Sequence, residues 1–188
     1  MLIVIEGVDG TGKGTQIELL KKEFPNAVFV KYPTPKFGIL SEYLEKKVEI
    51  SKKALFLTFL ADIADDQPRI QKMLNEGKTI IMDRYVLSTI AYELGEIGQE
   101  NAARVVDGVR LIKPDKIILL DIEIDKAMKR KANQKTPDRY EEDKKHLMQV
   151  REKFLSLMGE RFLSTIWHKI DASKTIEEVH SEIVNLIK

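Results

Sequence analysis

Near its start the chain reads Glu6-Gly7-Val8-Asp9-Gly10-Thr11-Gly12-Lys13-Gly14-Thr15-Gln16, and this segment joins an apolar run at residues 2–5 to a segment with helical patterning. Four residues separate Gly7 from the pair Gly12-Lys13. Glycines allow a backbone to turn its N–H groups inward around an anion, and the helix that follows directs its positive end at the same anion. The stretch therefore predicts a phosphate-binding loop whose Lys13 reaches the β- and γ-phosphates of a nucleotide.

The residue after the lysine departs from the strict phosphate-loop pattern, which has Ser or Thr at that position. Here Gly14 follows Lys13, and Thr15 comes next. Thr15 is therefore the candidate hydroxyl ligand for Mg²⁺ on the nucleotide, directly or through water.

Short apolar runs alternate with longer helical patterns along the rest of the chain, which has the length of one domain. This alternation predicts an α/β fold, a parallel sheet covered by helices on both faces in a three-layer α/β/α sandwich. Strands are expected over residues 2–5, 27–30, 79–82, 117–122 and 166–170. Helices are expected over residues 13–24, 38–47, 52–76, 85–94, 98–111, 125–133, 141–160 and 175–188. The basic segment at about 126–141 is expected to form a mobile flap.

A second polar cluster follows the strand expected at residues 79–82. Asp83 and Arg84 come directly after its apolar residues, and Ser88 and Tyr92 follow in the next helical segment. In open α/β sheets, ligands bind at the carboxyl edge of the strands. We expect Asp83 to organise Mg²⁺ through water and Arg84 to bind a second phosphate group with its planar fork. An ion pair between these two side chains at the strand end is the alternative interpretation.

The composition argues against several functional classes. Lys and Arg total 31 against 30 Asp and Glu, so that the net charge of +1 predicts no general attraction to nucleic acid or to an anionic membrane. No apolar run approaches the roughly 18 residues that cross a bilayer, and residues 1–5 lack the basic flank of a signal peptide. The absence of cysteine excludes thiol chemistry and disulfides. We therefore expect a cytoplasmic protein that binds small molecules.

Four motifs follow one another in a set order along the chain. They are Glu6 to Lys13, Asp83-Arg84-Tyr85 with Ser88, Ala91 and Tyr92, Lys113-Pro114-Asp115 before a strand, and Asp171-Ala172-Ser173-Lys174 before the last helix. Together they resemble the thymidylate kinase family of P-loop nucleoside monophosphate kinases, and the resemblance spans essentially the whole chain. It implies a P-loop NTPase fold with a five-stranded parallel sheet and a helical lid, a homodimer, and transfer of the γ-phosphoryl group from ATP–Mg²⁺ to dTMP, giving dTDP and ADP.

The resemblance assigns the donor site to the phosphate loop and to two later segments. Lys13 would be a catalytic cation within the loop. Arg130 resembles a lid arginine that lies against adenine, and Ser173 and Lys174 resemble the loop at the adenine edge. The loop residues expected to bind ATP are Gly7, Val8, Asp9, Gly10, Thr11, Gly12, Lys13, Gly14 and Thr15.

The resemblance also implies an acceptor site. Asp9 would meet the 3′-hydroxyl of the acceptor, and Arg84 would bridge the acceptor phosphate and the transferred group. Phe59 resembles the ring that stacks on thymine, although an aromatic residue at this helical spacing is otherwise a core residue. Ser88 and Tyr92 share the motif of Arg84 and are expected beside the acceptor.

The end of the expected lid supplies two further residues by resemblance. Arg139 would be a catalytic residue in contact with phosphates, and Tyr140 would crowd the 2′ position and so favour deoxyribose. Many relatives instead carry an arginine in the phosphate loop, where this chain has Gly10. Such a site relies on lid arginines, which agrees with the basic flap.

Two acceptor positions differ from the family's pattern. Ile63 stands where a base-reading arginine is usual, and Pro35 stands where a phosphate-binding arginine is usual, which leaves Lys36 as the expected substitute. Nearby candidates to read the base edge are Asp62, Asp66 and Gln67. These differences keep open a kinase of the same group that acts on dUMP, UMP or CMP. A P-loop switch that regulates a partner is a third interpretation, against which stands the absence of an Asn-Lys-x-Asp motif.

Overall fold

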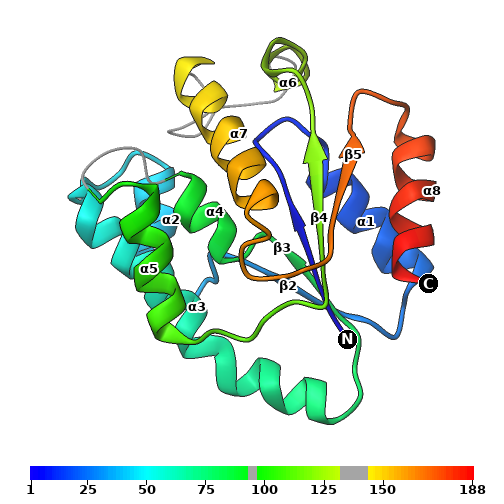
Figure 1. Cartoon of the computed structure of the whole chain (residues 1–188), viewed down its shortest axis with the longest axis horizontal. Coiled ribbons are helices and arrows are strands. Elements are labelled where there is room, and N and C mark those ends of the chain that lie inside the picture. The colour runs from blue at the N-terminus through cyan, green and yellow to red at the C-terminus, as the bar shows by residue number, and fades with distance from the viewer. Residues whose placement is uncertain (93–96, 132–143) are drawn as a thin grey trace.

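The computed structural model describes residues 1–92, 97–131 and 144–188. Within these residues it contains a five-stranded sheet in the order β2-β3-β1-β4-β5, and all neighbouring strands are parallel, as predicted (Figure 1). The strands are β1 (Leu2–Glu6), β2 (Val28–Lys31), β3 (Ile80–Asp83), β4 (Lys116–Asp121) and β5 (Trp167–Asp171).

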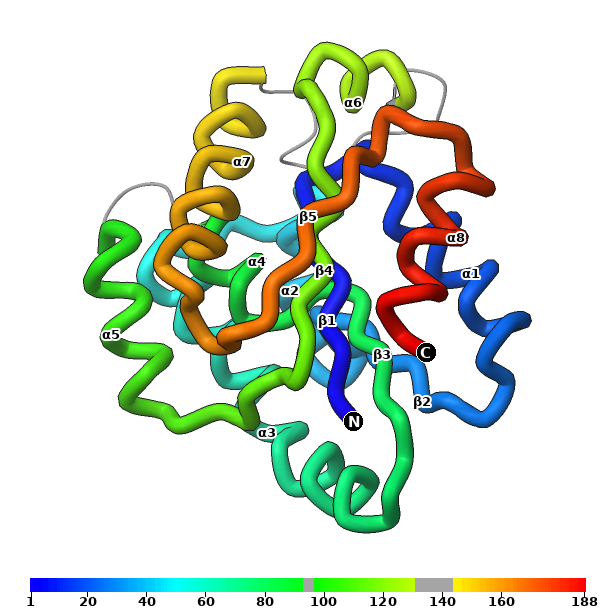
Figure 2. Tube along the Cα trace, turned by 45° about the vertical axis from the view of Figure 1, so that its right-hand side comes forward, coloured from blue at the N-terminus to red at the C-terminus, as the bar shows by residue number. Residues whose placement is uncertain are grey.

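Helices cover both faces of the sheet and confirm the predicted three layers. They are α1 (Lys13–Glu23), α2 (Gly38–Leu44), α3 (Lys52–Asn75), α4 (Val86–Ala91), α5 (Gln99–Val109), α6 (Ile124–Lys131), α7 (Lys144–Gly159) and α8 (Ile176–Ile187). Helices α1 and α8 lie side by side on one face, and α3, α4, α5 and α7 lie on the other (Figures 1 and 2). None of the helices in the described ranges is both long and apolar enough to cross a membrane.

The centre of the sheet explains why the first strand leads into a site. Residues Leu2 to Ile5 of β1 are at most 1% exposed, because β3 and β4 flank the strand and helices cover both of its faces. Ile3 of β1 aligns with Ile81 of β3 and with Lys116 of β4. The chain therefore leaves β1 at the middle of the carboxyl edge of the sheet, where a topological switch point forms a crevice.

Most element boundaries differ from those predicted by one or more residues, and three elements show the differences well. Helix α2 ends at Leu44 rather than at residue 47, since Lys46 takes the left-handed conformation with φ 62°. Helix α4 begins at Val86, because Tyr85 is extended, and its last helical residue is Ala91. Strand β2 begins one residue later than predicted, at Val28.

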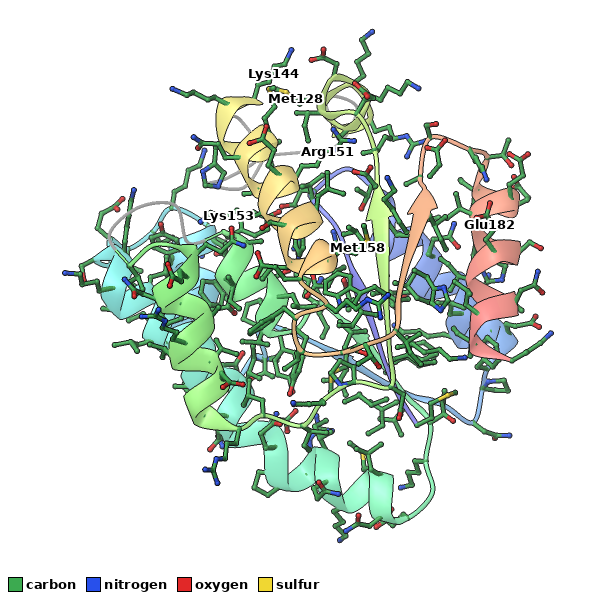
Figure 3. All side chains as sticks on the ribbon, viewed as in Figure 1. Met128, Lys144, Arg151, Lys153, Met158 and Glu182 are labelled. Atoms are coloured by element: carbon green, nitrogen blue, oxygen red, sulfur yellow. The ribbon has the colours of Figure 1, made fainter. Side chains whose placement is uncertain are left out.

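Helix α7 is tied to the carboxyl end of β4. The guanidinium group of Arg151 forms two hydrogen bonds with the Asp121 carboxylate, at 2.6 and 2.9 Å, and lies between the two elements (Figure 3). The buried face of the helix consists of Leu147, Val150, Phe154 and Leu157. These contacts hold α7 beside the edge at which β1 enters its loop.

Candidate active site

The phosphate loop predicted from the sequence lies between β1 and α1. Gly12 is the N-cap of α1 in the left-handed conformation, with φ 90°, and no side chain caps the helix start. A Cβ atom on Gly7 would collide with the backbone carbonyl of Leu120 in β4. Glycine at these two positions therefore lets the loop turn tightly at the sheet edge and leads into the positive end of the helix.

Lys13 is the first residue of α1, and its buried side chain turns back into this loop. Its ammonium group donates hydrogen bonds to the carbonyl oxygens of Gly7 at 2.7 Å and of Val8 at 3.0 Å. Burial and the nearby charge of Arg84 lower the pKa of Lys13 to about 8, against the opposing effect of Asp9. The loop thus holds a cation whose charge is sensitive to its surroundings.

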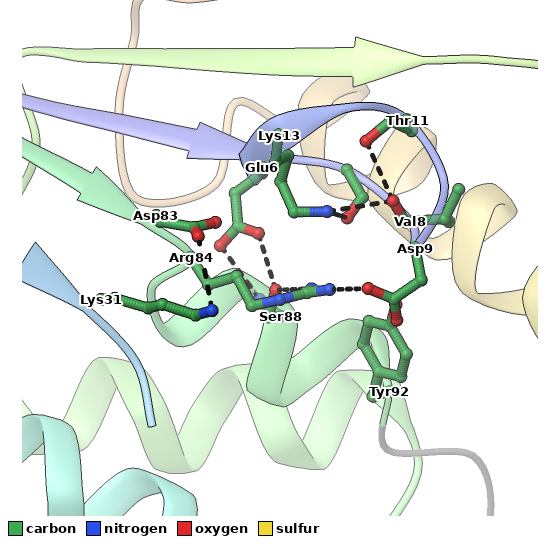
Figure 4. A network of polar contacts seen from close by, with 11 residues as sticks. Glu6, Val8, Asp9, Thr11, Lys13, Lys31, Asp83, Arg84, Ser88 and Tyr92 are labelled. Atoms are coloured by element: carbon green, nitrogen blue, oxygen red, sulfur yellow. Dashed lines mark hydrogen bonds and ion pairs between the residues drawn. The ribbon is translucent and has the colours of Figure 1, made fainter. Parts of the chain in front are cut away.

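Arg84 stands at the end of β3 with a positive φ of 70°, which directs its backbone out of the strand. Its guanidinium group forms an ion pair with the carboxylate of Asp9 and donates a hydrogen bond of 3.0 Å to Ser88 Oγ (Figure 4). The Tyr92 hydroxyl donates to Asp9 at 2.8 Å, and the Tyr92 ring centroid lies 5.4 Å from Arg84 Cζ. The structure therefore brings together four residues predicted for the site, from two separate segments.

The ion pair expected as the alternative at this strand end has different partners. Arg84 pairs with Asp9, whereas the Asp83 carboxylate lies 4.0 Å from the ammonium group of Lys31. Burial by itself lowers the pKa of Arg84, but the charges of Asp9 and of the other acidic groups nearby raise that pKa well above its usual value. Arg84 is accordingly a permanent cation between β1 and β3.

Two adjoining pockets open onto this cluster. The larger one encloses about 600 Å³ and follows the phosphate loop, and it is called here the donor pocket. The other, called here the acceptor pocket, lies between α3 and α4 and has an aromatic and aliphatic wall. Asp9 and Arg84 line both pockets. A molecule bound in one pocket would therefore meet a molecule bound in the other at these two side chains.

The donor pocket extends from the phosphate loop to α6 and to the loop between β5 and α8. Arg130 and Lys174 both line it. Arg130 donates a hydrogen bond of 2.8 Å to the Ala172 carbonyl, which joins α6 to that loop. Ser173 is not among the lining residues, and its N–H group donates to Asp171 Oδ1 at 2.8 Å.

The candidate metal ligands also border the donor pocket. Thr15 and Asp83 both line it. Asp83 Oδ1 is a buried oxygen atom that has no hydrogen-bond partner among the described residues. A buried carboxylate oxygen in this condition fits the chemistry of a hard cation or of its bound water.

The acceptor pocket is lined by Tyr32, Pro33, Leu44, Leu55, Phe56, Phe59, Ile63, Tyr85, Ser88, Thr89 and Tyr92, in addition to the two shared residues. Phe59 is partly buried against the small cluster of Leu40, Tyr43 and Leu55. Its ring thus has both a packing role and a face in the pocket. Thr89, a nearly buried hydroxyl on α4, was missed by the sequence reasoning.

The three candidates to read the base edge have other partners, and none lines the acceptor pocket. Asp62 accepts hydrogen bonds from the backbone and hydroxyl of Thr34, at 2.7 and 2.5 Å. Asp66 accepts from the hydroxyl of Tyr32 at 2.9 Å. The side-chain carbonyl of Gln67 accepts from the N–H group of Ile112 at 2.8 Å and from the hydroxyl of Tyr85 at 3.1 Å. In this structure these three side chains therefore support the walls of the pocket rather than line it.

Other residues predicted for the site either line neither pocket or lie outside the described residues. Lys36 forms an exposed ion pair with Asp65 and lines neither pocket. Arg139, Tyr140 and most of the expected lid at 126–141 lie outside the described residues. Lys31, which lines the donor pocket, was missed. Its place at the carboxyl end of a predicted strand is the signal that could have identified it.

Comparisons with known proteins point to one family. A family model described as thymidylate kinase matches residues 5–183. The chain is 36% identical to a probable thymidylate kinase from Methanocaldococcus jannaschii, over 100% of this chain and 96% of the relative. It is 33% identical to thymidylate kinase from Homo sapiens, over 97% of this chain and 87% of the relative.

A solved structure of thymidylate kinase from Candida albicans superposes with a TM-score of 0.79 at 28% identity, covering 99% of this chain and 90% of that one. Together, the family match, the sequence relatives and this neighbour agree over nearly the full length. The chain belongs to the thymidylate kinase family.

Proposed function

We propose that this chain transfers the γ-phosphoryl group of ATP to dTMP, giving ADP and dTDP, with ATP in the donor pocket and dTMP in the acceptor pocket. The observation that carries the proposal is that Asp9 and Arg84 line both pockets. Reacting phosphates in the two pockets would then lie end to end, which is the alignment that in-line phosphoryl transfer requires.

The reaction needs positioning and positive charge more than covalent chemistry. An oxygen of the dTMP phosphate attacks the γ-phosphorus of ATP, and the bond to the leaving ADP oxygen breaks. The acceptor phosphate is already an anion, so no general base has to remove a proton. In the proposal, Lys13 and the loop amides bind the donor phosphates, and Arg84 neutralises charge on the acceptor phosphate and on the transferred group.

The binding of the two nucleotides follows from the character of the two pockets. The aromatic and aliphatic wall of the acceptor pocket, which includes Phe59, suits a flat pyrimidine base, with the Thr89 hydroxyl available to its edge. Asp9 would accept a hydrogen bond from the 3′-hydroxyl of the acceptor. Arg130 and Lys174, which line the donor pocket but not the acceptor pocket, would lie beside the adenine.

The donor site fits a Mg²⁺ ion that arrives with ATP. Asp83, whose buried Oδ1 has no partner in the described part of the chain, and Thr15 would hold the ion directly or through water. When bound, Mg²⁺ would neutralise charge on the β- and γ-phosphates of ATP. Replacement of Asp83 by Asn should raise the Mg²⁺ concentration needed for half-maximal activity.

The base preference is tested by one coupled assay, with ATP against dTMP, dUMP, UMP and CMP. A preference for dTMP supports the proposal. A preference for another monophosphate would instead identify a kinase of the same group with a different acceptor. Slow hydrolysis of ATP that no acceptor accelerates would point to a nucleotide switch.

The homodimer implied by the resemblance is also part of the proposal. Helix α3 carries Leu57, which is 54% exposed although it is a large apolar residue. An apolar side chain on an exposed helix face suits contact with a second copy. Light scattering should give twice the mass of the chain, and Leu57→Lys should shift the protein toward the monomer. The cytoplasmic location stays a prediction.

A further inference from the structure

Glu6, the last residue of β1, has a fully buried carboxylate that the mechanism above does not use. One carboxylate oxygen accepts hydrogen bonds from the backbone N–H groups of Tyr85 at 2.8 Å and of Ser88 at 3.2 Å. The other oxygen accepts from the Ser88 hydroxyl at 2.6 Å. The side chain thus crosses from the central strand to the start of α4 (Figure 4).

This carboxylate acts as the N-terminal cap of α4. Tyr85 is the N-cap residue, and its own side chain makes no capping hydrogen bond. Glu6 takes that role from another strand, because its negative charge satisfies N–H groups at the positive end of the helix. A helix of six residues is too short to be stable by itself. Its orientation, and with it that of the acceptor-pocket residues Ser88 and Thr89, therefore depends on tertiary contacts, which are the packing of its buried side chains and this polar anchor.

The anchor continues through Ser88 to Arg84. The Ser88 hydroxyl gives its single hydrogen to Glu6, which leaves its lone pairs to accept the hydrogen bond of 3.0 Å from Arg84 Nη1. The backbone of Arg84 is held on the same strand, since its N–H group donates to the Ile5 carbonyl at 3.1 Å. Such support is needed, because a positive φ is unfavourable for a residue other than glycine.

We propose that Glu6 is a positioning residue for phosphoryl transfer: through Ser88 it holds the guanidinium group of Arg84 at the junction of the donor and acceptor pockets. Glu6 directly precedes Gly7, so that one residue links the start of the phosphate loop to the wall of the acceptor pocket. The inference deepens the proposed function and depends on it for the identity of the reaction.

The surroundings of Glu6 stabilise its buried carboxylate. Burial raises the pKa of this carboxyl group, while the Arg84 charge and the hydrogen bonds from Ser88 and Tyr85 oppose that rise. A buried carboxylate is costly unless its hydrogen bonds are satisfied. Here both oxygens are used, and all three donors belong to the segment that carries Arg84.

The first test is Glu6→Gln, which keeps the size of the side chain. The amide nitrogen donates to Ser88 Oγ rather than accepting from it, so the hydroxyl hydrogen must turn toward Arg84. We expect kcat to fall about 10- to 100-fold and the KM for dTMP to rise, since small displacements of a catalytic group have effects of this size. The KM for ATP should change less than about twofold, because the loop amides remain.

A fall in kcat with little change in the KM for ATP distinguishes a positioning role of Glu6 from a purely structural one. A folded variant with kcat within about threefold of the wild type would contradict the proposal. An equal loss of ATP and dTMP binding would also contradict it, because that result indicates a general collapse of the loop. Asp115→Asn is the matched control: Asp115 Oδ2 accepts a hydrogen bond of 2.6 Å from the Leu2 N–H group at the other end of β1, so this change should leave kcat unaltered.

The second test removes the Ser88 hydroxyl, which links Glu6 to Arg84. Ser88→Ala should lower kcat in the same way, and this variant decides the question if Glu6→Gln does not fold. The double variant Glu6→Gln, Ser88→Ala should be no less active than the less active of the two single variants, because both substitutions break the same path of contacts. Additive losses would overturn the path through Ser88.

The third test does not depend on the reaction. Crystal structures of the wild type and of Glu6→Gln should show the guanidinium group of Arg84 displaced from Asp9 and Ser88 in the variant. An unmoved Arg84 would overturn the inference. If the wild type itself fails to phosphorylate dTMP, the proposed function fails, and the position of Arg84 still decides the role of Glu6.

Discussion

Gly10 of the phosphate loop lies directly against the backbone of Ala127 in α6. A Cβ atom on Gly10 would stand 2.6 Å from the Ala127 carbonyl oxygen and 3.0 Å from its Cβ atom. Gly10 also has a φ of 87°, which side-chain-bearing residues rarely adopt. The loop that would bind phosphate and the helix that carries Arg130 are therefore in contact only because residue 10 has no side chain.

This contact predicts the effect of Gly10→Ala. The new methyl group must displace either the loop or α6, in addition to a backbone strain of about 1–3 kcal/mol. We expect a thermal midpoint several degrees lower and an increased KM for ATP, measured by calorimetry and by steady-state kinetics. The control is Gly108→Ala in α5, where an added Cβ meets nothing within 4 Å. This change should raise stability by about 0.5–1 kcal/mol and leave the KM for ATP unchanged.

Replacement of Arg84 tests the junction of the two pockets. Arg84→Ala should lower kcat at least about 100-fold, because it removes the cation expected to face both phosphates. Arg84→Lys keeps the charge but not the fork that reaches Asp9 and Ser88 together, so it should recover only part of the activity.

The matched control for Arg84 is Arg104→Ala. Arg104 is exposed on α5, pairs with Glu100 at 2.6 Å and lines neither pocket. Its loss should not change kcat. Near-normal turnover of a folded Arg84→Ala variant would remove Arg84 from the mechanism.

The depressed pKa of Lys13 predicts a pH dependence of ATP binding. Lys13 binds phosphate only when protonated, and without nucleotide it loses its proton near pH 8 rather than near 10.5. Bound phosphates raise this pKa, so affinity is greatest below pH 8 and falls as the pH rises above it. Titration calorimetry at pH values on both sides of 8, in buffers of different ionisation enthalpy, should show proton uptake on the alkaline side.

Lys13→Met is the control for this dependence. It should bind ATP more weakly at every pH and without the proton uptake. A wild-type affinity that stays constant through pH 8 would show that the charge of Lys13 is retained there. The lowered pKa also affects stability. Below pH 8 the buried charge of Lys13 reduces the free energy of unfolding, and this reduction disappears as the pH rises from 8 to 10.5.

Replacement of Phe59 tests whether its ring stacks on the acceptor base or only packs in the small apolar cluster. Phe59→Ala should raise the KM for dTMP about tenfold or more, as expected for the loss of an aromatic face against a base, with the KM for ATP unchanged. Leu40→Ala is the matched variant, because Leu40 is buried in the same small cluster but does not line the acceptor pocket. Its main effect should be a loss of about 2–5 kcal/mol of stability. Equal effects of the two variants on the KM for dTMP would assign Phe59 to the core alone.

The donor side of the site was predictable because its signals are local. The glycine spacing, Lys13 and the apolar run before them act within a dozen consecutive residues, and the loop lies where it was expected, between β1 and α1. Asp83 follows the same logic, since an apolar run that ends in a carboxylate places that carboxylate at the edge of the sheet.

The acceptor wall was predicted less well, because its polar residues are held by distant segments. Asp62 and Gln67 lie on the same helix as Phe59, which suggested contact with the base. Instead, Asp62 accepts a hydrogen bond from Thr34, 28 residues away in the chain. Gln67 accepts one from Ile112, 45 residues away. Helical spacing alone cannot tell a side chain that faces a pocket from one that supports its wall.

The strands, the phosphate loop and the family could be predicted from the amino-acid order, because periodicity and glycine spacing are properties of neighbouring residues. The contacts of Glu6 with Ser88 and of Asp9 with Arg84 join residues 82 and 75 positions apart, and they could be found only in the folded chain. The reason is the order of the sheet: β1 pairs directly with β3, so the loops that follow these two strands emerge side by side at one edge.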